Sequence, residues 1–432
     1  MSRSREILAV GRLTGDALAG VVDTVREVHR AVARRAFAAV GPAAAPIRVV
    51  HDQIADGVYG VVRGAHRALP RGVAVVAAAG TAVVEAAASG MAPAGAGRSG
   101  QPPLSSSPPA GLVLAVLNAL WGDTLARRYP ELELTMSLRA RGVDVPATPA
   151  GLAAAYPVAT SRIAVFVPGL SETEQYWALS SRRHYGTGHD THGSRLRRDL
   201  GYTPVYLRYN SGLHVCDNGI RLARLLDDLA TGWPVPVEEI VLVGHSMGGL
   251  VARSACHYAG CGMHPSAPLI RHVFCLGTPH LGAPLEKGVN AAAWLAARVP
   301  ESRPLARLAN LRSVGVKDLR YGSLVEEDWR DSDPDEFLRD RCTEVPFLPH
   351  AAYYFIGTTV TADHDHPLAK IIGDLFVQFP SASGTGRRRR IPFELDNGRH
   401  LGGLHHFDLL NHPDVYHQIR TWLTRAAKPA ST

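Results

Sequence analysis

A serine between two glycines lies where a predicted strand would meet a predicted helix. Segment 241–249 reads VLVGHSMGG, and in it Gly244, Ser246 and Gly248 form a GxSxG pattern directly after the apolar run 240–243. The segment after the pattern, LVARSACHYA, is typical of a helix. Glycines on both sides of a serine relieve crowding at a sharp backbone turn, which leaves the hydroxyl exposed at the N-terminus of the helix. We predict that Ser246 is a nucleophile at such an elbow; the alternative is a serine that only caps the helix.

Two adjacent histidines near the C-terminus are candidates for the base that such a serine needs. A serine hydroxyl is a poor nucleophile unless an imidazole removes its proton, and the imidazole needs a carboxylate that fixes its tautomer. After an elbow of this kind, the acid and then the histidine follow in chain order. His405 and His406 lie in GLHHFDLLNHPDVYHQI, before a final predicted helix. We expect one of them to be the base, and His245, inside the elbow, to be a neighbour of the serine.

Candidate acids follow the strand-like run 353–359. They are Asp363, Asp365 and Asp374, the last within IIGDLFVQFPSASG. We predict that Asp374 orients the histidine. In the alternative, Asp363 or Asp365 does so and Asp374 caps a turn. Asp408 lies too near the histidine pair in sequence to be the usual partner.

Two backbone N–H groups are expected to hold the oxyanion that forms when a serine attacks an acyl carbon. One comes from the residue after the nucleophile, Met247, and the other from the loop after an early strand. That loop reads FVPGLSETE, and we predict that Leu170 supplies the second N–H, because Gly169 lets the backbone approach closely. The alternative is an ordinary turn between a strand and a helix.

Other groups of polar residues do not indicate a metal or a cofactor. Cys256, His257, Cys261 and His264 crowd together, but their spacing matches no common zinc finger. The histidine- and aspartate-rich segments 189–192 and 364–366 are expected to be solvated loops. The run 387–390, RRRR, is expected to be a solvated loop as well, with an anionic headgroup site as the alternative. We therefore predict no metal and no cofactor.

The elements that would position these residues alternate between strand and helix. Strand-like runs occur at 132–138, 162–167, 204–208, 240–243, 272–276 and 353–359, and helix-like runs at 220–229 and 249–258. This order predicts an α/β protein with a doubly wound, mostly parallel sheet. The region 282–349 is far longer than an ordinary connection, so we predict a lid insertion there. Its apolar segment 291–299 would cover a pocket or, alternatively, pack permanently on the core.

The first part of the chain predicts a separate helical segment, residues 1–91. Apolar residues recur at helical spacing over 7–32 and again over 50–69, which favours a helical hairpin. Residues 92–110 are almost entirely Ala, Gly, Pro and Ser and form a predicted linker, so that 111–432 would be the catalytic domain. The Arg-rich helices could lie on an anionic membrane or granule surface; the alternative is packing on the core or on another subunit.

Composition excludes several classes of protein. The 432 residues are 46% hydrophobic and 20% charged, which is typical of a soluble globular protein. The net charge is +7, but no aromatic-rich basic motif indicates nucleic-acid binding. Five scattered cysteines and the lack of a signal-peptide pattern lead us to expect reduced thiols and a cytoplasmic protein, with peripheral membrane contact through the N-terminal helices as a further expectation.

Several segments resemble the lipase and esterase branch of the α/β-hydrolase superfamily. FVPGL, GHSMGG, CLGTPHLGAP and GDLFV with HHFDLL are similar to bacterial triacylglycerol lipases and to GPI inositol-deacylase-like hydrolases, over roughly residues 160–425. The resemblance implies a Ser, Asp, His triad, no redox cofactor and carboxylic ester substrates, often lipids. It favours His406 over His405, because FDLL follows it. The chain departs from the pattern at Pro168, where a His is common, and at Leu375, where a Gly commonly follows the acid.

The residues and the resemblance together predict a serine hydrolase that cleaves lipid-like acyl esters through an acyl-enzyme. Its partner would be a small-molecule or lipid ester substrate. A thioesterase or acyltransferase of the same fold would share the triad and differ in leaving group or acceptor. From another class, the chain could be a non-catalytic scaffold on a membrane or on a lipid or polyester granule.

Overall fold

The chain forms two compact units. The computed structural model describes residues 3–40, scattered positions between 45 and 74, and residues 107–426 except 263, 299–301, 334, 337–339, 367–372 and 387–388. One unit comprises residues 1–111, 124–133 and 289–312, and the other comprises 112–123, 134–288 and 313–432. The predicted linker lies outside the described residues up to position 106, and helix α3 (Pro108–Arg128) begins in its last three positions.

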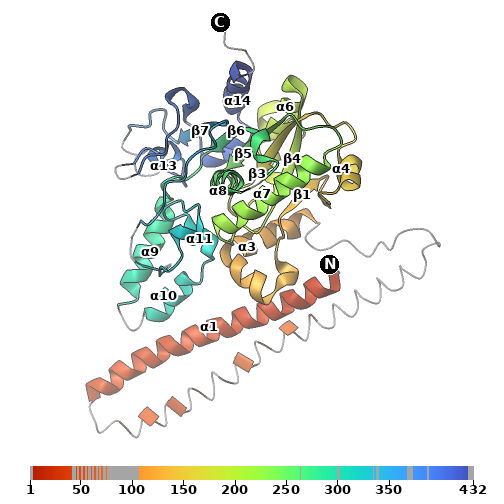
Figure 1. Ribbon diagram of the computed structural model, residues 1–432. Coiled ribbons are helices and arrows are strands. Elements are labelled where there is room, and N and C mark those ends of the chain that lie inside the picture. Colours follow the sequence, from red (N-terminus) through yellow and green to blue (C-terminus); the bar gives the residue numbers. More distant parts are fainter. Residues whose placement is uncertain are drawn as a thin grey trace, which may run out of the picture. The chain divides into compact units, whose positions relative to one another are not determined.

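One sheet organises the second unit. Among the described residues, eight strands form it in the order β2-β1-β4-β3-β5-β6-β7-β8 (Figure 1). The strands are β1 Ser137–Ala140, β2 Val143–Val145, β3 Arg162–Val167, β4 Tyr202–Arg208, β5 Glu239–His245, β6 Ile270–Leu276, β7 Ala352–Thr359 and β8 Gly398–Gly402. Strands β3 to β8 pair in parallel, whereas β1 is antiparallel to both β2 and β4. The predicted mostly parallel sheet is confirmed.

The predicted strand over 132–138 is wrong for most of its length. Pro130–Leu132 form a 3-10 helix, and β1 begins only at Ser137. Leu132 and Leu134 are buried, which explains the alternating pattern. The N–H of Leu134, however, donates to the side chain of Asn118 at 3.0 Å and not to a neighbouring strand. The alternating apolar pattern therefore reflects alternating burial in a segment that pairs with no strand.

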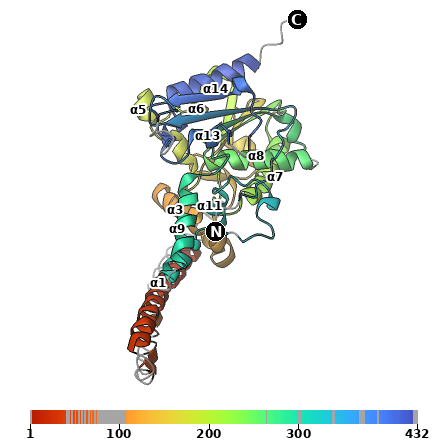
Figure 2. The ribbon, with the colours of Figure 1, turned by 90° about the vertical axis from the view of Figure 1, so that its left-hand side faces the viewer.

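Helices cover both faces of the sheet. Along β3, Ile163 and Val165 belong to one apolar cluster, and Ala164 and Phe166 belong to the other. The first cluster includes residues of α7 (Val215–Gly232) and α8 (Met247–Cys261), and the second includes residues of α6 (His192–Leu200) and α14 (Pro413–Ala426). Figure 2 shows these pairs of helices on opposite sides of the sheet. Burial on both faces explains the continuous apolar runs of the central strands, and each fully buried Ile or Leu contributes about 1.5–3 kcal/mol to stability.

Shorter helices occupy the connections. The α-helices are α4 Pro149–Ala155, α5 Ser181–Tyr185, α9 Pro284–Ala296, α10 Arg303–Asn310, α11 Val314–Asp318 and α13 Phe379–Ala382. The 3-10 helices besides Pro130–Leu132 are η4 Glu174–Ala178, η5 Ala267–Leu269, η6 Glu326–Asp328, η7 Leu395–Asn397 and η8 His406–Leu410. The predicted lid region 282–349 contains α9, α10 and α11, and its residues 289–312 belong to the first unit. Its motion stays a prediction.

The first unit contains one long helix, α1, which spans Arg3–Val40 and includes the predicted helix over 7–32. Asp16 pairs with Arg71 at 2.6 Å and Asp23 with Arg63 at 3.0 Å, both across the turn of the predicted hairpin. Glu27 also pairs with Arg307 at 2.7 Å. The first two ion pairs fit the predicted helical hairpin. Nowhere in the described part of the chain is a helix both long and apolar enough to cross a membrane.

Candidate functional site

The predicted elbow joins β5 directly to α8. Ser246 has φ 52° and ψ −123°, a strained conformation for a residue with a side chain. A Cβ atom at Gly244 would lie 2.5 Å from the backbone nitrogen of Gly249, and one at Gly248 would lie 2.2 Å from the carbonyl oxygen of Val167. Both positions therefore exclude a side chain, which is the physical reason for the GxSxG pattern.

The serine is the accessible residue of this turn. Ser246 is half-buried, whereas His245 and Met247 on either side are buried. The N–H of Ser246 donates to the carbonyl of Leu276, at the end of β6, over 2.8 Å. Because β5 and β6 are neighbouring parallel strands, the elbow is anchored at the carboxyl edge of the sheet, where open α/β sheets bind ligands.

The structure brings the predicted base and the predicted acid together. Nδ1 of His406 lies 2.7 Å from Oδ2 of Asp374, and their exposed fractions are only 3% and 1%. The other carboxylate oxygen accepts the N–H groups of Phe376 and Val377 at 3.0 and 2.8 Å. Burial alone would raise the pKa of Asp374, but His406 and these two N–H groups outweigh burial and lower it. A carboxylate that stays ionised here can fix the His406 tautomer with Nδ1 protonated, which leaves Nε2 as the proton acceptor.

The imidazole of His406 lies against the elbow. A Cβ atom at Gly277 would be 3.0 Å from Cε1 of His406, and Gly277 directly follows the residue that accepts the Ser246 N–H. The rings of His406 and His245 have centroids 4.7 Å apart. The predicted base thus lies beside Gly277 and His245, the residue before Ser246.

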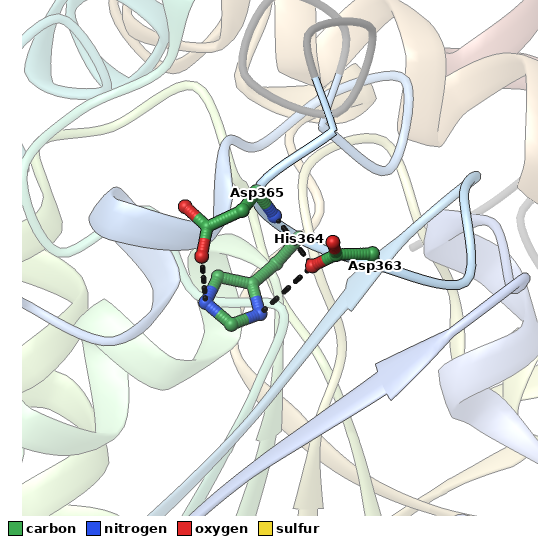
Figure 3. Close-up of side chains that lie close together, drawn as sticks. All are labelled: Asp363, His364 and Asp365. Carbon is green, nitrogen blue, oxygen red and sulfur yellow. Dashed lines mark hydrogen bonds and ion pairs between the residues drawn. The ribbon is translucent and has the colours of Figure 1, made fainter.

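The alternative acids and the alternative base have other partners. Asp363 and Asp365 are exposed and flank His364, with nitrogen–oxygen distances of 3.9 and 3.6 Å (Figure 3). Atoms of these three side chains lie within 4.8 Å of one another, but exposed acidic groups commonly occur without a metal. His405 lies 3.3 Å from Asp408, and its side chain is 43% exposed. Asp374 and His406 are therefore the pair whose geometry suits the predicted chemistry.

The predicted oxyanion loop, residues 168–172, is held from several sides. The hydroxyl of Tyr209 donates to the carbonyl of Pro168 at 2.8 Å, and the N–H of Ser171 donates to Ser211 at 3.2 Å. The N–H of Gly169 donates to the carboxylate of Glu172 at 2.6 Å. Leu170 is half-buried in this loop, and Met247 begins α8. Their role as oxyanion donors stays a prediction.

One buried carboxylate beside the elbow was not predicted from the sequence. Glu172 is 4% exposed, and its Oε1 atom lies 2.8 Å from Nδ1 of His245. His245 is fully buried, as a neighbour of the serine should be, and it also has a carboxylate partner. The sequence gives only a weak indication of this partner, namely a glutamate three positions after Gly169 in the predicted oxyanion loop.

The sheet, the elbow after β5 and the chain order Ser246, Asp374, His406 define an α/β-hydrolase fold. A family model for the PGAP1-like alpha/beta domain matches residues 222–338, a segment that includes Ser246. The predicted resemblance to this class is therefore confirmed. No curated protein sequence matches the chain.

Several solved structures similar to the chain carry lipase or esterase names. The mature lipase BlEst2 of Bacillus licheniformis is 18% identical, with 67% of this chain and 97% of that chain covered and a TM-score of 0.39. A lipase-esterase related protein of Clostridium acetobutylicum is 14% identical, with 67% and 99% covered and a TM-score of 0.32. EstA of Clostridium botulinum is 15% identical, with 63% and 89% covered and a TM-score of 0.35. The function proposed below rests on the geometry of the site.

Proposed function

We propose that the protein is a serine hydrolase that cleaves carboxylic esters with Ser246, His406 and Asp374. The observation that carries this proposal is the buried hydrogen bond between His406 and Asp374 beside a strained serine elbow. A buried imidazole that is oriented by a carboxylate and lies next to the turn of a half-buried serine has the geometry of a general base for a hydroxyl nucleophile.

In the proposed reaction, Oγ of Ser246 attacks the acyl carbon while Nε2 of His406 takes the hydroxyl proton. The N–H groups of Met247 and Leu170 hold the oxyanion of the tetrahedral intermediate. When the intermediate collapses, the carbon–oxygen bond to the alcohol breaks, and Nε2 returns its proton to the leaving alcohol. Water then repeats the sequence on the acyl-enzyme and releases the acid. Asp374 keeps its negative charge throughout and stabilises the imidazolium.

Apolar side chains beside the acid support a lipid-like acyl substrate. Leu375 and Phe376 directly follow Asp374 and are 57% and 43% exposed. The ring of Phe376 lies 5.3 Å from that of His406. A partly exposed aromatic ring beside the proposed base, next to an exposed Leu375, would favour a hydrocarbon chain over a polar group. An acyl thioester, or an acceptor other than water, would suit the same atoms, so thioester hydrolysis and acyl transfer are the alternative outcomes of the test.

The test of the proposal is labelling with a fluorophosphonate together with hydrolysis of p-nitrophenyl esters from acetate to palmitate. We expect the wild-type protein to be labelled and to prefer longer acyl chains. Ser246→Ala should lose both activities, and Ser137→Ala, a matched change on β1, should keep both. A folded wild-type protein that takes no label would overturn the proposal and favour a non-catalytic scaffold.

Contact with an anionic surface through α1 is a second, separate proposal. Leu8, Val10 and Leu18 of α1 are 36%, 40% and 37% exposed, in a helix that also carries many arginines. Apolar and basic side chains together favour the headgroup region of an anionic bilayer. Co-sedimentation with phosphatidylserine vesicles should therefore be reduced when these three residues are replaced by Glu, and unchanged binding would contradict this proposal.

A further inference from the structure

Besides His406 and Asp374, a buried histidine–carboxylate pair includes His245, the residue before the proposed nucleophile. Oε1 of Glu172 is 2.8 Å from Nδ1 of His245, and neither residue reaches solvent to any useful extent, with 4% and 0% exposed. The two residues come from different elements: Glu172 from the oxyanion loop after β3, and His245 from the last position of β5.

The outer atoms of the pair contact two further parts of the site. Oε2 of Glu172 accepts the N–H of Gly169, the neighbour of Leu170, at 2.6 Å. Nε2 of His245 lies 3.2 Å from the backbone carbonyl oxygen of His406. A single buried pair therefore connects the oxyanion loop, the residue before Ser246 and the backbone of the proposed base.

The acceptors around the ring determine where the protons are. A carbonyl oxygen can only accept, so Nε2 of His245 must carry a hydrogen to bond the carbonyl of His406. A neutral imidazole has only one N–H, and in His245 that hydrogen is on Nε2. Nδ1 faces a carboxylate oxygen, so it can donate a hydrogen bond there only if the ring carries a second proton. Both ring nitrogens of His245 therefore face an oxygen acceptor, Oε1 of Glu172 at Nδ1 and the carbonyl of His406 at Nε2, which favours a doubly protonated His245. Burial lowers the pKa of His245, but the charge and hydrogen bond of Glu172, helped by the carbonyl of His406, outweigh burial and raise it.

We infer that Glu172 and His245 form a charged pair that positions the oxyanion loop and His406 for the ester hydrolysis proposed above. Neither residue is assigned a contact with the substrate, so both are positioning residues. Stability alone does not explain such a pair, because taking two charges out of water is expensive and apolar side chains of similar volume are often as stable. Other polar groups near the pair are Asp374, which also favours a charged His245, and Tyr209, which bonds Pro168 of the same loop.

Glu172→Gln tests the charge while keeping the shape. The amide oxygen can still accept the Gly169 N–H, and the amide nitrogen can donate to Nδ1 of a neutral His245 whose Nε2–H still reaches His406. Glu172→Ala removes both bonds. We expect kcat to fall roughly tenfold in the Gln variant and about 100-fold in the Ala variant, with KM changed less than about twofold, because small misplacements of reacting groups affect the transition state most.

Nitrogen NMR of labelled histidine gives a readout that does not depend on activity. Wild-type protein should keep both ring nitrogens of His245 protonated at pH values above the ordinary histidine range, and Glu172→Gln should show one protonated nitrogen. A wild-type His245 with a single N–H would overturn the inference, even if the Ala variant failed to fold.

The matched control is Asp227→Asn. Asp227 pairs with His264 at 2.5 Å, between α7 and the segment before η5, and both residues are half-buried. This change removes a histidine–carboxylate pair and should leave kcat at the wild-type value. If wild-type protein takes the fluorophosphonate label but folded Glu172→Ala keeps the wild-type kcat, the positioning role fails alone. If wild-type protein takes no label, the proposed function fails instead.

Discussion

Two groups of histidine and aspartate follow β7 in the chain, and they differ in burial and in geometry. In the first, Asp374 and His406 are buried and 2.7 Å apart. In the second, Asp363 and Asp365 lie 3.9 and 3.6 Å from His364, and both aspartate side chains are 70% exposed (Figure 3). The same residue types therefore form a short, buried hydrogen bond in the first group and only long, exposed contacts in the second.

A carboxylate can orient a histidine when it is buried and accepts backbone N–H groups. The presence of a carboxylate near a histidine is not sufficient. Charges at a solvated surface attract each other weakly, and their side chains keep several conformations. Asp374 is held at both oxygens, by His406 on one side and by the N–H groups of Phe376 and Val377 on the other. Four predictions test this comparison.

The largest effect on kcat should come from neutralising Asp374. Asp374→Asn would allow the wrong tautomer of His406, so kcat for a p-nitrophenyl ester should fall about 10³–10⁴-fold. Asp363→Asn and Asp365→Asn should leave kcat within about twofold, because exposed side chains away from the base contribute little. Equal losses in all three variants would show that the exposed cluster takes part in the reaction.

The second prediction concerns stability in acid. The pKa of Asp374 is lowered from 3.8 in the folded protein, so its contribution to the free energy of unfolding is present above that pH and is lost as the pH falls through the lowered value. Urea unfolding of wild type and Asp374→Asn should therefore differ most near neutral pH and converge in acid. A difference that grows as the pH falls would contradict the sign of this shift.

A smaller effect should follow from the turn that presents Asp374. Leu375 has φ 91°, in the region that favours glycine. Leu375→Gly should remove strain and raise the free energy of unfolding by up to about 1 kcal/mol, since the greater freedom of glycine in the unfolded chain offsets part of the gain. Thermal unfolding checks this, and a lower melting temperature would show that the exposed Leu375 side chain contributes contacts.

The smallest effect is expected at the exposed cluster itself. Because surface ion pairs contribute about 0–1 kcal/mol, Asp363→Asn and Asp365→Asn should change the free energy of unfolding by less than about 0.5 kcal/mol. Added Ca²⁺ should leave the melting temperature unchanged, as the prediction of no metal requires. A calcium-dependent rise that disappears in Asp365→Asn would identify the cluster as a metal site.

The sequence alone determined the parts of this protein that depend on local chemistry. The GxSxG pattern after an apolar run predicted the elbow, because only glycine fits at Gly244 and Gly248. Five apolar runs predicted β3 to β7, since strands buried on both faces have few polar positions. The short strands β1 and β2 and the exposed β8 lacked this signal, and the false strand over 132–138 shows that alternating burial has other causes.

Tertiary structure decided which distant residues meet. Nothing in the local sequence distinguishes Asp374 from Asp363 and Asp365 as firmly as the contact with His406, which joins positions 32 residues apart. The pairing of Glu172 with His245 spans 73 residues and was not predicted. Likewise, only the folded chain shows that residues 289–312, inside the predicted lid, belong to the same unit as α1. Turns and apolar periodicity are set by neighbours along the chain, whereas a buried ion pair depends on two segments that the whole sheet must bring together.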